Sequence, residues 1–123
     1  MTDAETHVEE LRAELGDALR GVVLADIRDR EFDVLYMRDD VWEMYEAETQ
    51  QDIFEDAVFE ALGRQRKEDL FDPLGELRST VRVFDYGINV MSWQGRDGVF
   101  VGLGPDADAI PAAVETAHAL AEE

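Results

Sequence analysis

"VRVFDYGINVMSWQGRDGVFVGLG", residues 81–104, predicts three short strands joined by two tight turns. Apolar side chains fall on both alternating positions of each strand, whereas an antiparallel hairpin usually keeps one face in water. Residues 85–87 predict a three-residue loop with glycine in the left-handed position, and residues 95–98 predict a longer loop. The two-sided apolar pattern indicates a sheet that is covered by helices on both faces.

Two further strands precede this stretch. Residues 20–27 and 32–37 are rich in apolar and β-branched side chains, and the polar residues 28–31 lie between them. The pattern predicts a hairpin with a four-residue loop. Together with the three later strands it makes a five-stranded antiparallel sheet.

Three helices are expected around these strands. Apolar residues recur at helical spacing in residues 8–15 and again in residues 110–121. The broadest apolar face lies in residues 53–62, behind Thr49 and Asp52, which are spaced as in a capping box. The order helix, two strands, helix, three strands, helix predicts an α+β fold, a five-stranded antiparallel sheet with helices on both faces.

The most extreme property of the chain is its charge. Thirty acidic residues stand against 11 basic ones, of which only Lys67 is lysine, and the formal net charge is −19 at pH 7. Self-repulsion of this size destabilises a compact state in dilute buffer, but molar salt, with a Debye length of ~3 Å, screens it. An acid-rich, lysine-poor composition is typical of extremely halophilic archaea. We therefore expect a halophilic archaeal protein, the alternative being an ordinary acidic mesophilic one.

The composition also limits the compartment and the partners. The chain has no cysteine, which excludes disulfides, thiolate zinc sites and cysteine nucleophiles. Its acidic start and the lack of an apolar run of ~20 residues favour a cytoplasmic protein without a membrane span. The one basic cluster, Arg64, Arg66 and Lys67, lies where the central helix is expected to end, so we expect no nucleic-acid binding. A single domain over residues 1–123 is the expectation.

The sequence contains no pattern that indicates catalysis. Residues 102–108, "GLGPDAD", resemble a phosphate loop only weakly, because their aspartates already lie where the phosphate would bind. His7 and His118 lack a second ligand at helical spacing, which favours lone surface histidines. Asp39 and Asp40 are explained as a helix cap. We expect no cofactor, no metal and no enzymatic activity.

The element order resembles the roadblock/LC7 family. The runs "LRAELGDALRGVVLADIRDREFDVLYM" (11–37) and "VRVFDYGINVMSWQGRDGVFVGLGPDADAIPAAVETAHAL" (81–120) carry the resemblance on either side of the central helix. Within them, "GVFVGLGPDAD" (98–108) is similar to the family's last strand and its Gly/Pro/Asp turn into the final helix. The resemblance implies a non-catalytic dimeric scaffold or a regulator of small GTPases. The alternatives are a small-molecule sensor of PAS-like or profilin-like type and an uncharacterised halophilic family.

The resemblance also implies where two copies meet. In roadblock-like sheets the third strand lies at an edge and pairs with its mate, and the central helices pack nearby. Here that strand, residues 79–84, has neither a proline nor a lysine, two residues that protect a free edge. The interface residues we predict are Thr80, Arg82, Val83, Phe84, Phe54, Val58, Trp42 and Tyr45. The last two belong to types enriched at hot spots, although a short helix packed on its own sheet also explains them.

Overall fold

The computed structural model describes residues 3–26, 28–94 and 97–122, and its strands form one antiparallel sheet. The strands are β1 (Leu19–Asp26), β2 (Glu31–Met37), β3 (Ser79–Phe84), β4 (Gly87–Gln94) and β5 (Asp97–Leu103). Their order in space is β2-β1-β5-β4-β3, so β2 and β3 are the two edges. The five-stranded antiparallel sheet predicted from the sequence is confirmed.

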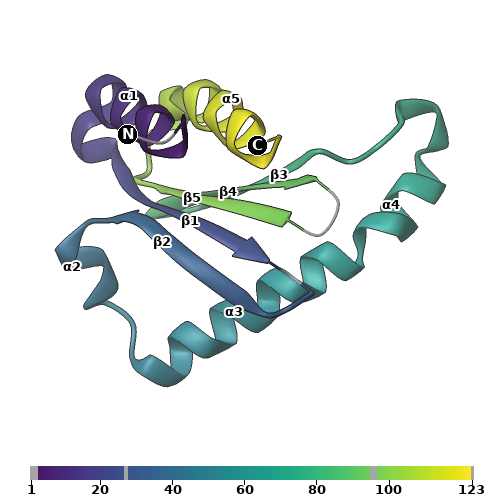
Figure 1. Ribbon diagram of the computed structural model, residues 1–123, viewed down its shortest axis with the longest axis horizontal. Coiled ribbons are helices and arrows are strands. Elements are labelled where there is room, and N and C mark those ends of the chain that lie inside the picture. Colours follow the sequence, from purple (N-terminus) through teal and green to yellow (C-terminus); the bar gives the residue numbers. More distant parts are fainter. Residues whose placement is uncertain (1–2, 27, 95–96, 123) are drawn as a thin grey trace.

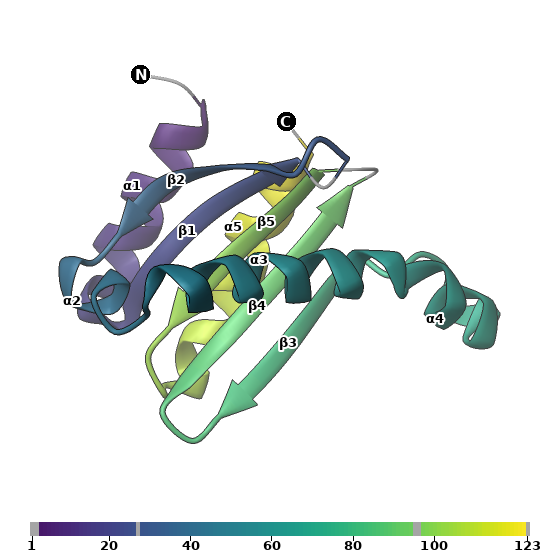
Figure 2. The same ribbon diagram turned by 90° about the horizontal axis from the view of Figure 1, so that it is seen from below.

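Helices cover both faces of the sheet (Figure 1). The helices α1 (Asp3–Leu15) and α5 (Ile110–Ala121) lie on one face, and α3 (Ala47–Leu62) lies on the other. Figure 2 shows that α3 crosses the strands obliquely. Short elements complete the order: α2 (Asp39–Trp42), α4 (Arg64–Leu70) and the 3-10 turns η1 (Gly16–Ala18), η2 (Asp72–Leu74) and η3 (Ala107–Ala109). The predicted order is confirmed, with these short helices as additions.

The main core lies between the sheet and the pair α1 and α5. Small residues on α5, Ala113 and Ala117, are fully buried, so this helix approaches the strands closely. Val22, Val90 and Val101 face it from three neighbouring strands and are also fully buried. Each such valine contributes about 1.5–3 kcal/mol through burial. This face of the sheet is closed within one copy of the chain.

The face under α3 is covered more thinly. Trp93 is buried there and packs edge-on against Phe100, with 5.5 Å between the ring centroids. From α3, Phe54 reaches Phe32 of β2 with a centroid distance of 5.4 Å. Among the described residues of α3, Ala57 alone is buried. Apolar side chains thus occupy both faces of the strands because each face has its own helical layer.

The apolar face predicted for residues 53–62 is only partly buried. Ile53 is 49% exposed, Phe59 71% and Leu62 69%. The helix crosses the strands obliquely (Figure 2). Its side chains contact both edge strands, through Phe54 to Phe32 of β2 and through Asp56 and Glu60 to Arg82 of β3. The sheet therefore covers only part of this face, and α3 leaves apolar surface in water.

The side-chain caps predicted for the central and last helices differ from those in the structure. The capping box predicted at Thr49 and Asp52 is wrong, because α3 already begins at Ala47 and has no side-chain cap. Asp106 or Asp108 is the expected cap of the last helix. Asp106 caps the 3-10 turn η3 before it, since its Oδ1 accepts a hydrogen bond from the backbone N–H of Asp108 at 3.0 Å, whereas α5 itself has no side-chain cap.

The turn between β3 and β4 is shorter than predicted. Phe84 pairs with Gly87, so residues 85–86 form a two-residue loop. Gly87 is not among the described glycines with positive φ, and the left-handed position predicted for it is wrong. A Cβ atom at Gly87 would lie 2.9 Å from Nη1 of Arg20, so glycine here makes room for a guanidinium group.

The other two predicted hairpin loops include residues that belong to the neighbouring strands. Asp26 pairs with Glu31, so Glu31 belongs to β2 rather than to the loop. In the predicted loop 95–98, Asp97 and Gly98 belong to β5. The expected strand residue 27 and the loop residues 95–96 lie outside the described residues.

Candidate interaction surface

The edge strand β3 leaves one side of its backbone unpaired. It pairs with β4 and has no neighbour on its other side among the described strands. The N–H of Trp93 donates to the carbonyl oxygen of Arg78 at 3.0 Å, which makes these two residues a hydrogen-bonded pair. Such pairs alternate along an antiparallel ladder, so even-numbered residues of β3 bond to β4. The amides of Val81 and Val83 therefore point to the open edge.

Apolar side chains are exposed along this edge. Val83 is 68% exposed, Phe84 54% and Tyr86 83%. Unpaired backbone groups beside exposed apolar side chains are a template for pairing with a strand of another chain. The edge has the composition of an interface rather than of a protected surface.

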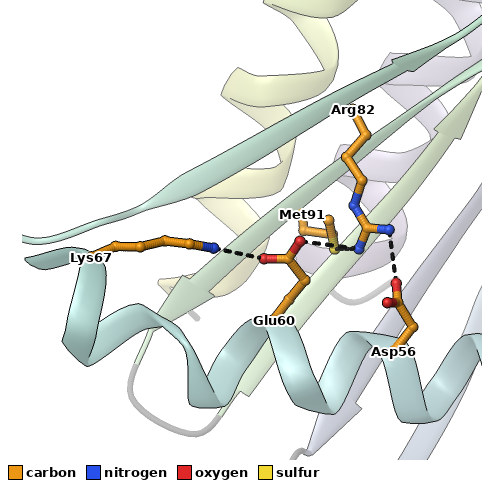
Figure 3. Close-up of polar contacts among 5 residues, drawn as sticks. All are labelled: Asp56, Glu60, Lys67, Arg82 and Met91. Carbon is orange, nitrogen blue, oxygen red and sulfur yellow. Dashed lines mark hydrogen bonds and ion pairs between the residues drawn. The ribbon is translucent and has the colours of Figure 1, made fainter.

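Arg82 connects the edge strand to α3 (Figure 3). Its Nη1 lies 2.7 Å from Oδ2 of Asp56, and its Nη2 lies 3.5 Å from Oε1 of Glu60. The Nη2 group also lies 3.3 Å from the sulfur of Met91, and Nζ of Lys67 lies 3.1 Å from Oε2 of Glu60. The guanidinium group thus holds α3 over the edge strand, and the backbone of Arg82 bonds to β4. The interface role of Arg82 stays a prediction.

The remaining predicted interface residues fall into two groups. Thr80, Phe54 and Val58 are half-buried. Trp42 is 40% exposed and Tyr45 39%. An open groove of about 440 Å³ beside α2 is lined by Val34, Met37, Asp39, Trp42 and Glu43. The Trp42 segment therefore offers aromatic surface next to a groove instead of completing a core.

Asp39 and Asp40 do not form the predicted cap. The N-cap of α2 is Arg38, and its side chain makes no cap hydrogen bond. Arg38 donates from Nε and Nη2 to the two carboxylate oxygens of Asp40, each at 2.7 Å, and from Nη1 to the carbonyl oxygen of Asp17. This pairing lowers the pKa of Asp40, and the charge of Arg20 adds to the effect. The carboxylate is an ion-pair partner and is not suited to accept protons near neutral pH.

A polar network connects β3, β4 and α5. Oγ of Ser79 lies 2.7 Å from Oγ of Ser92, which is fully buried, and also hydrogen-bonds Nε2 of His118. His118 is therefore not the lone surface histidine that the sequence predicts. Ser79 begins an edge strand, whereas serine nucleophiles of the α/β-hydrolase type sit at a strand-to-helix turn. The network joins the sheet to the helix, and no local sequence signal could have found it.

A second open groove, of about 480 Å³, lies at the end of the sheet beside the last turn of α5. Its apolar lining includes Leu24 and Leu120, and four carboxylates border it: Asp26, Glu31, Asp33 and Asp97. In the described part of the chain, no group of three or more potential ligands is placed to hold a metal ion. Over the same residues, no helix is both long and apolar enough to cross a membrane.

Comparison with known proteins agrees with this geometry. A family model described as "Domain of unknown function (DUF7522)" matches residues 5–123. No functionally curated protein matches the chain. A roadblock/LC7 domain from Streptomyces avermitilis is similar in structure, with a TM-score of 0.66, 18% sequence identity, and coverage of 98% of this chain and 93% of that one.

Two further solved structures show the same fold. "MglB with tetrameric arrangement" has a TM-score of 0.58 and 18% identity, over 97% of this chain and 85% of that one. The gliding protein MglB from Thermus thermophilus has a TM-score of 0.54 and 16% identity, over 97% of this chain and 88% of that one. The fold is therefore that of roadblock/LC7 domains, which confirms the resemblance seen in the sequence.

Proposed function

The chain belongs to the DUF7522 family, and from its roadblock/LC7 fold and its open β3 edge we propose that it is a non-catalytic homodimeric scaffold or regulatory module. The observation that carries the proposal is the unpaired side of β3. Its outward amides belong to Val81 and Val83, and exposed apolar side chains lie beside them.

A second copy of the chain is the partner that fits this edge. Pairing two β3 strands antiparallel about a two-fold axis satisfies the outward backbone groups of both copies at once. It also brings the two α3 helices, which carry exposed Ile53, Phe59 and Leu62, toward the same side of the joined sheet. The dimer would therefore cover apolar surface that one copy leaves in water.

The dimer would serve by binding another protein, and a small GTPase or a related signalling protein is the partner that the family resemblance implies. The aromatic surface around Trp42 and Tyr45 lies away from β3, beside the other edge strand, and stays available for that partner. Affinity capture from a high-salt lysate, using wild type against a Trp42→Ala/Tyr45→Ala variant, should recover a partner with wild type alone. Equal recovery by both would contradict the role of this surface.

The oligomeric state tests the proposal directly. Sedimentation in molar potassium chloride should show a dimer of the wild-type chain at concentrations of tens of micromolar. A monomer under these conditions would remove both the β3 interface and the dimeric function.

A second candidate function is a small-molecule sensor, favoured by the groove of about 480 Å³ at the end of the sheet. This volume falls in the range of ligand pockets, roughly 300–1,000 Å³. Its border of four carboxylates would select a cationic ligand. A thermal-shift screen of small organic cations discriminates the two functions, because a sensor gains stability with one compound whereas a scaffold gains none.

A further inference from the structure

Arg20 is a half-buried arginine that forms no ion pair with a described carboxylate; its charge acts on Asp40, but that carboxylate is bound by Arg38. Its Nε is buried and has no hydrogen-bond partner among the described residues. No described carboxylate lies within 4.0 Å of its guanidinium group, although the chain has 30 acidic residues. Other arginines do have such partners: Arg12, Arg38, Arg64, Arg78 and Arg82. Arg28, Arg30 and Arg66 have no described partner of this kind either, but they are exposed. Among the described arginines, Arg20 is thus the half-buried one without a carboxylate at ion-pair distance.

Three glycines form the surface on which Arg20 lies. A Cβ atom would be 2.9 Å from its Nη1 at Gly87, and 3.9 Å from its Nε at Gly104. At Gly102, a Cβ would be 3.8 Å from the Cβ of Arg20. Side chains alternate along β4, and Ile88 and Val90 belong to the core under α1 and α5, so Gly87 faces the opposite side, toward α3. The guanidinium group therefore lies on the α3 face, at the end of the sheet where β3 finishes.

The symmetry of the proposed dimer brings one segment of the second copy to this place. In an antiparallel pairing of two β3 strands, Ser79 of one copy lies near Phe84 of the other. Phe84 pairs with Gly87 of its own copy, and Gly87 lies against Arg20. Residues 68–76, "EDLFDPLGE", end two residues before β3, with Leu77 and Arg78 in between, and contain four acids and no base. The first residues of this segment are the last turn of α4, and Figures 1 and 2 both show that α4 extends beyond the sheet.

Apolar surfaces match at the same place. In residues 68–76, Phe71 is 58% exposed and Leu74 79%. At the end of β3, Phe84 and Tyr86 are 54% and 83% exposed. A two-fold axis through the β3 edge brings Phe71 and Leu74 of one copy toward Phe84 and Tyr86 of the other. Charge and apolar area are therefore complementary between the same two regions.

We propose that residues 68–76 of each copy dock on the Arg20 end of the other copy's sheet, where the carboxylates of Asp72 and Glu76 bind the Arg20 guanidinium. These two acids are the available ones, because Glu68 accepts the N–H of Leu77 at 2.8 Å and Asp69 accepts from Gln65 at 3.0 Å. The inference rests on the proposed homodimer and adds a specific intersubunit ion pair to it.

A charge exchange between copies tests the pair. In molar potassium chloride, where the chain is expected to be folded, Arg20→Glu alone should raise the dimer dissociation constant about 10- to 100-fold, because the new carboxylate then faces Asp72 and Glu76 of the other copy at both sites. Asp72→Arg/Glu76→Arg should do the same. An equimolar mixture of the two variants should form heterodimers of wild-type affinity, because both of its sites again join opposite charges. Analytical ultracentrifugation with one variant labelled by a fluorophore measures all three constants.

Matched controls separate this effect from net charge. Arg28→Glu, in the β1–β2 turn, changes the net charge by the same amount as Arg20→Glu. Glu10→Arg/Glu14→Arg on α1 changes it by the same amount as Asp72→Arg/Glu76→Arg. Both controls should dimerise with nearly wild-type affinity. The inference is overturned if Arg20→Glu behaves like Arg28→Glu, or if mixing does not restore association. A wild-type monomer would instead remove the proposed dimer itself.

Discussion

A proline at Val83 should separate two copies of the chain without unfolding either of them. The amide of Val83 points to the open edge and bonds to nothing in β4, so its loss costs the single copy little. The side chain is 68% exposed, and its replacement opens no cavity. Arg82, the preceding residue, is already in a strand, which is the conformation that a following proline requires.

The effect on the dimer can be worked out from the pairing. Each copy contributes one Val83 amide, so Val83→Pro removes two intersubunit hydrogen bonds from a symmetric dimer. At about 0.5–1.5 kcal/mol for each bond, the loss is about 1–3 kcal/mol. This corresponds to a dissociation constant about 5- to 150-fold higher. The proline ring also enters the space of the opposing strand, so the larger value is expected.

Two variants serve as comparisons. Val83→Ala keeps the amide and should remain a dimer with a dissociation constant close to that of wild type. Arg82→Pro removes a ladder bond to β4 and the contacts with Asp56 and Glu60, so it should lower the free energy of unfolding of the single copy. Sedimentation velocity gives the association state, and circular dichroism melting gives the stability. A Val83→Pro dimer as tight as wild type would refute the edge assignment.

Three more predictions concern stability. Circular dichroism over a potassium chloride series should show cooperative loss of structure below some hundreds of millimolar, because the net charge is −19; full structure in dilute buffer would contradict the halophilic interpretation. Gly98→Ala should cost about 1–3 kcal/mol in denaturant unfolding, since its Cβ would lie 2.7 Å from Cζ3 of Trp93. The cost should shrink in a Trp93→Leu background, and an undiminished cost would show that the ring is not the obstacle. Ala57→Asp should lower the free energy of unfolding by about 3–5 kcal/mol, because it places an unpaired charge at a buried site. Phe54→Ala, at a half-buried site, should lower it by less, and equal losses would mean that α3 packs differently.

The sheet could be predicted from the sequence because its signals are local. Alternating apolar residues and short polar turns mark the five strands, and their two-sided pattern requires helices on both faces. Glycine was harder to interpret. Gly87 was predicted as a left-handed turn residue, yet it belongs to β4 and makes room for Arg20, which is distant in the sequence. Composition alone cannot distinguish these two uses of glycine.

The end of the central helix shows a similar limit. The central helix was expected to end at the basic cluster 64–67, and α3 does end there, with Gly63 as its C-cap. What the sequence did not predict is that residues 64–70 form a further helix, α4. In the structure Gly63 has φ −78° and ψ −10°, which is right-handed, and the N–H of Lys67 still donates to its carbonyl oxygen. A glycine ends a helix most effectively in the left-handed conformation. Because Gly63 does not adopt it, the helical path continues into α4 and carries residues 68–76 beyond the sheet.

Electrostatics constrains how two such chains can meet. Two copies that each carry −19 repel one another at long range, so only a surface with little negative charge can form the first contact. In β3 the one charged residue is Arg82, and Asp56 and Glu60 already balance it, so the strand edge is close to neutral. Added salt screens the long-range repulsion but leaves backbone hydrogen bonds and apolar contacts nearly unchanged. The dimer should therefore tighten with salt and then level off, whereas an association driven by ion pairs alone would weaken throughout.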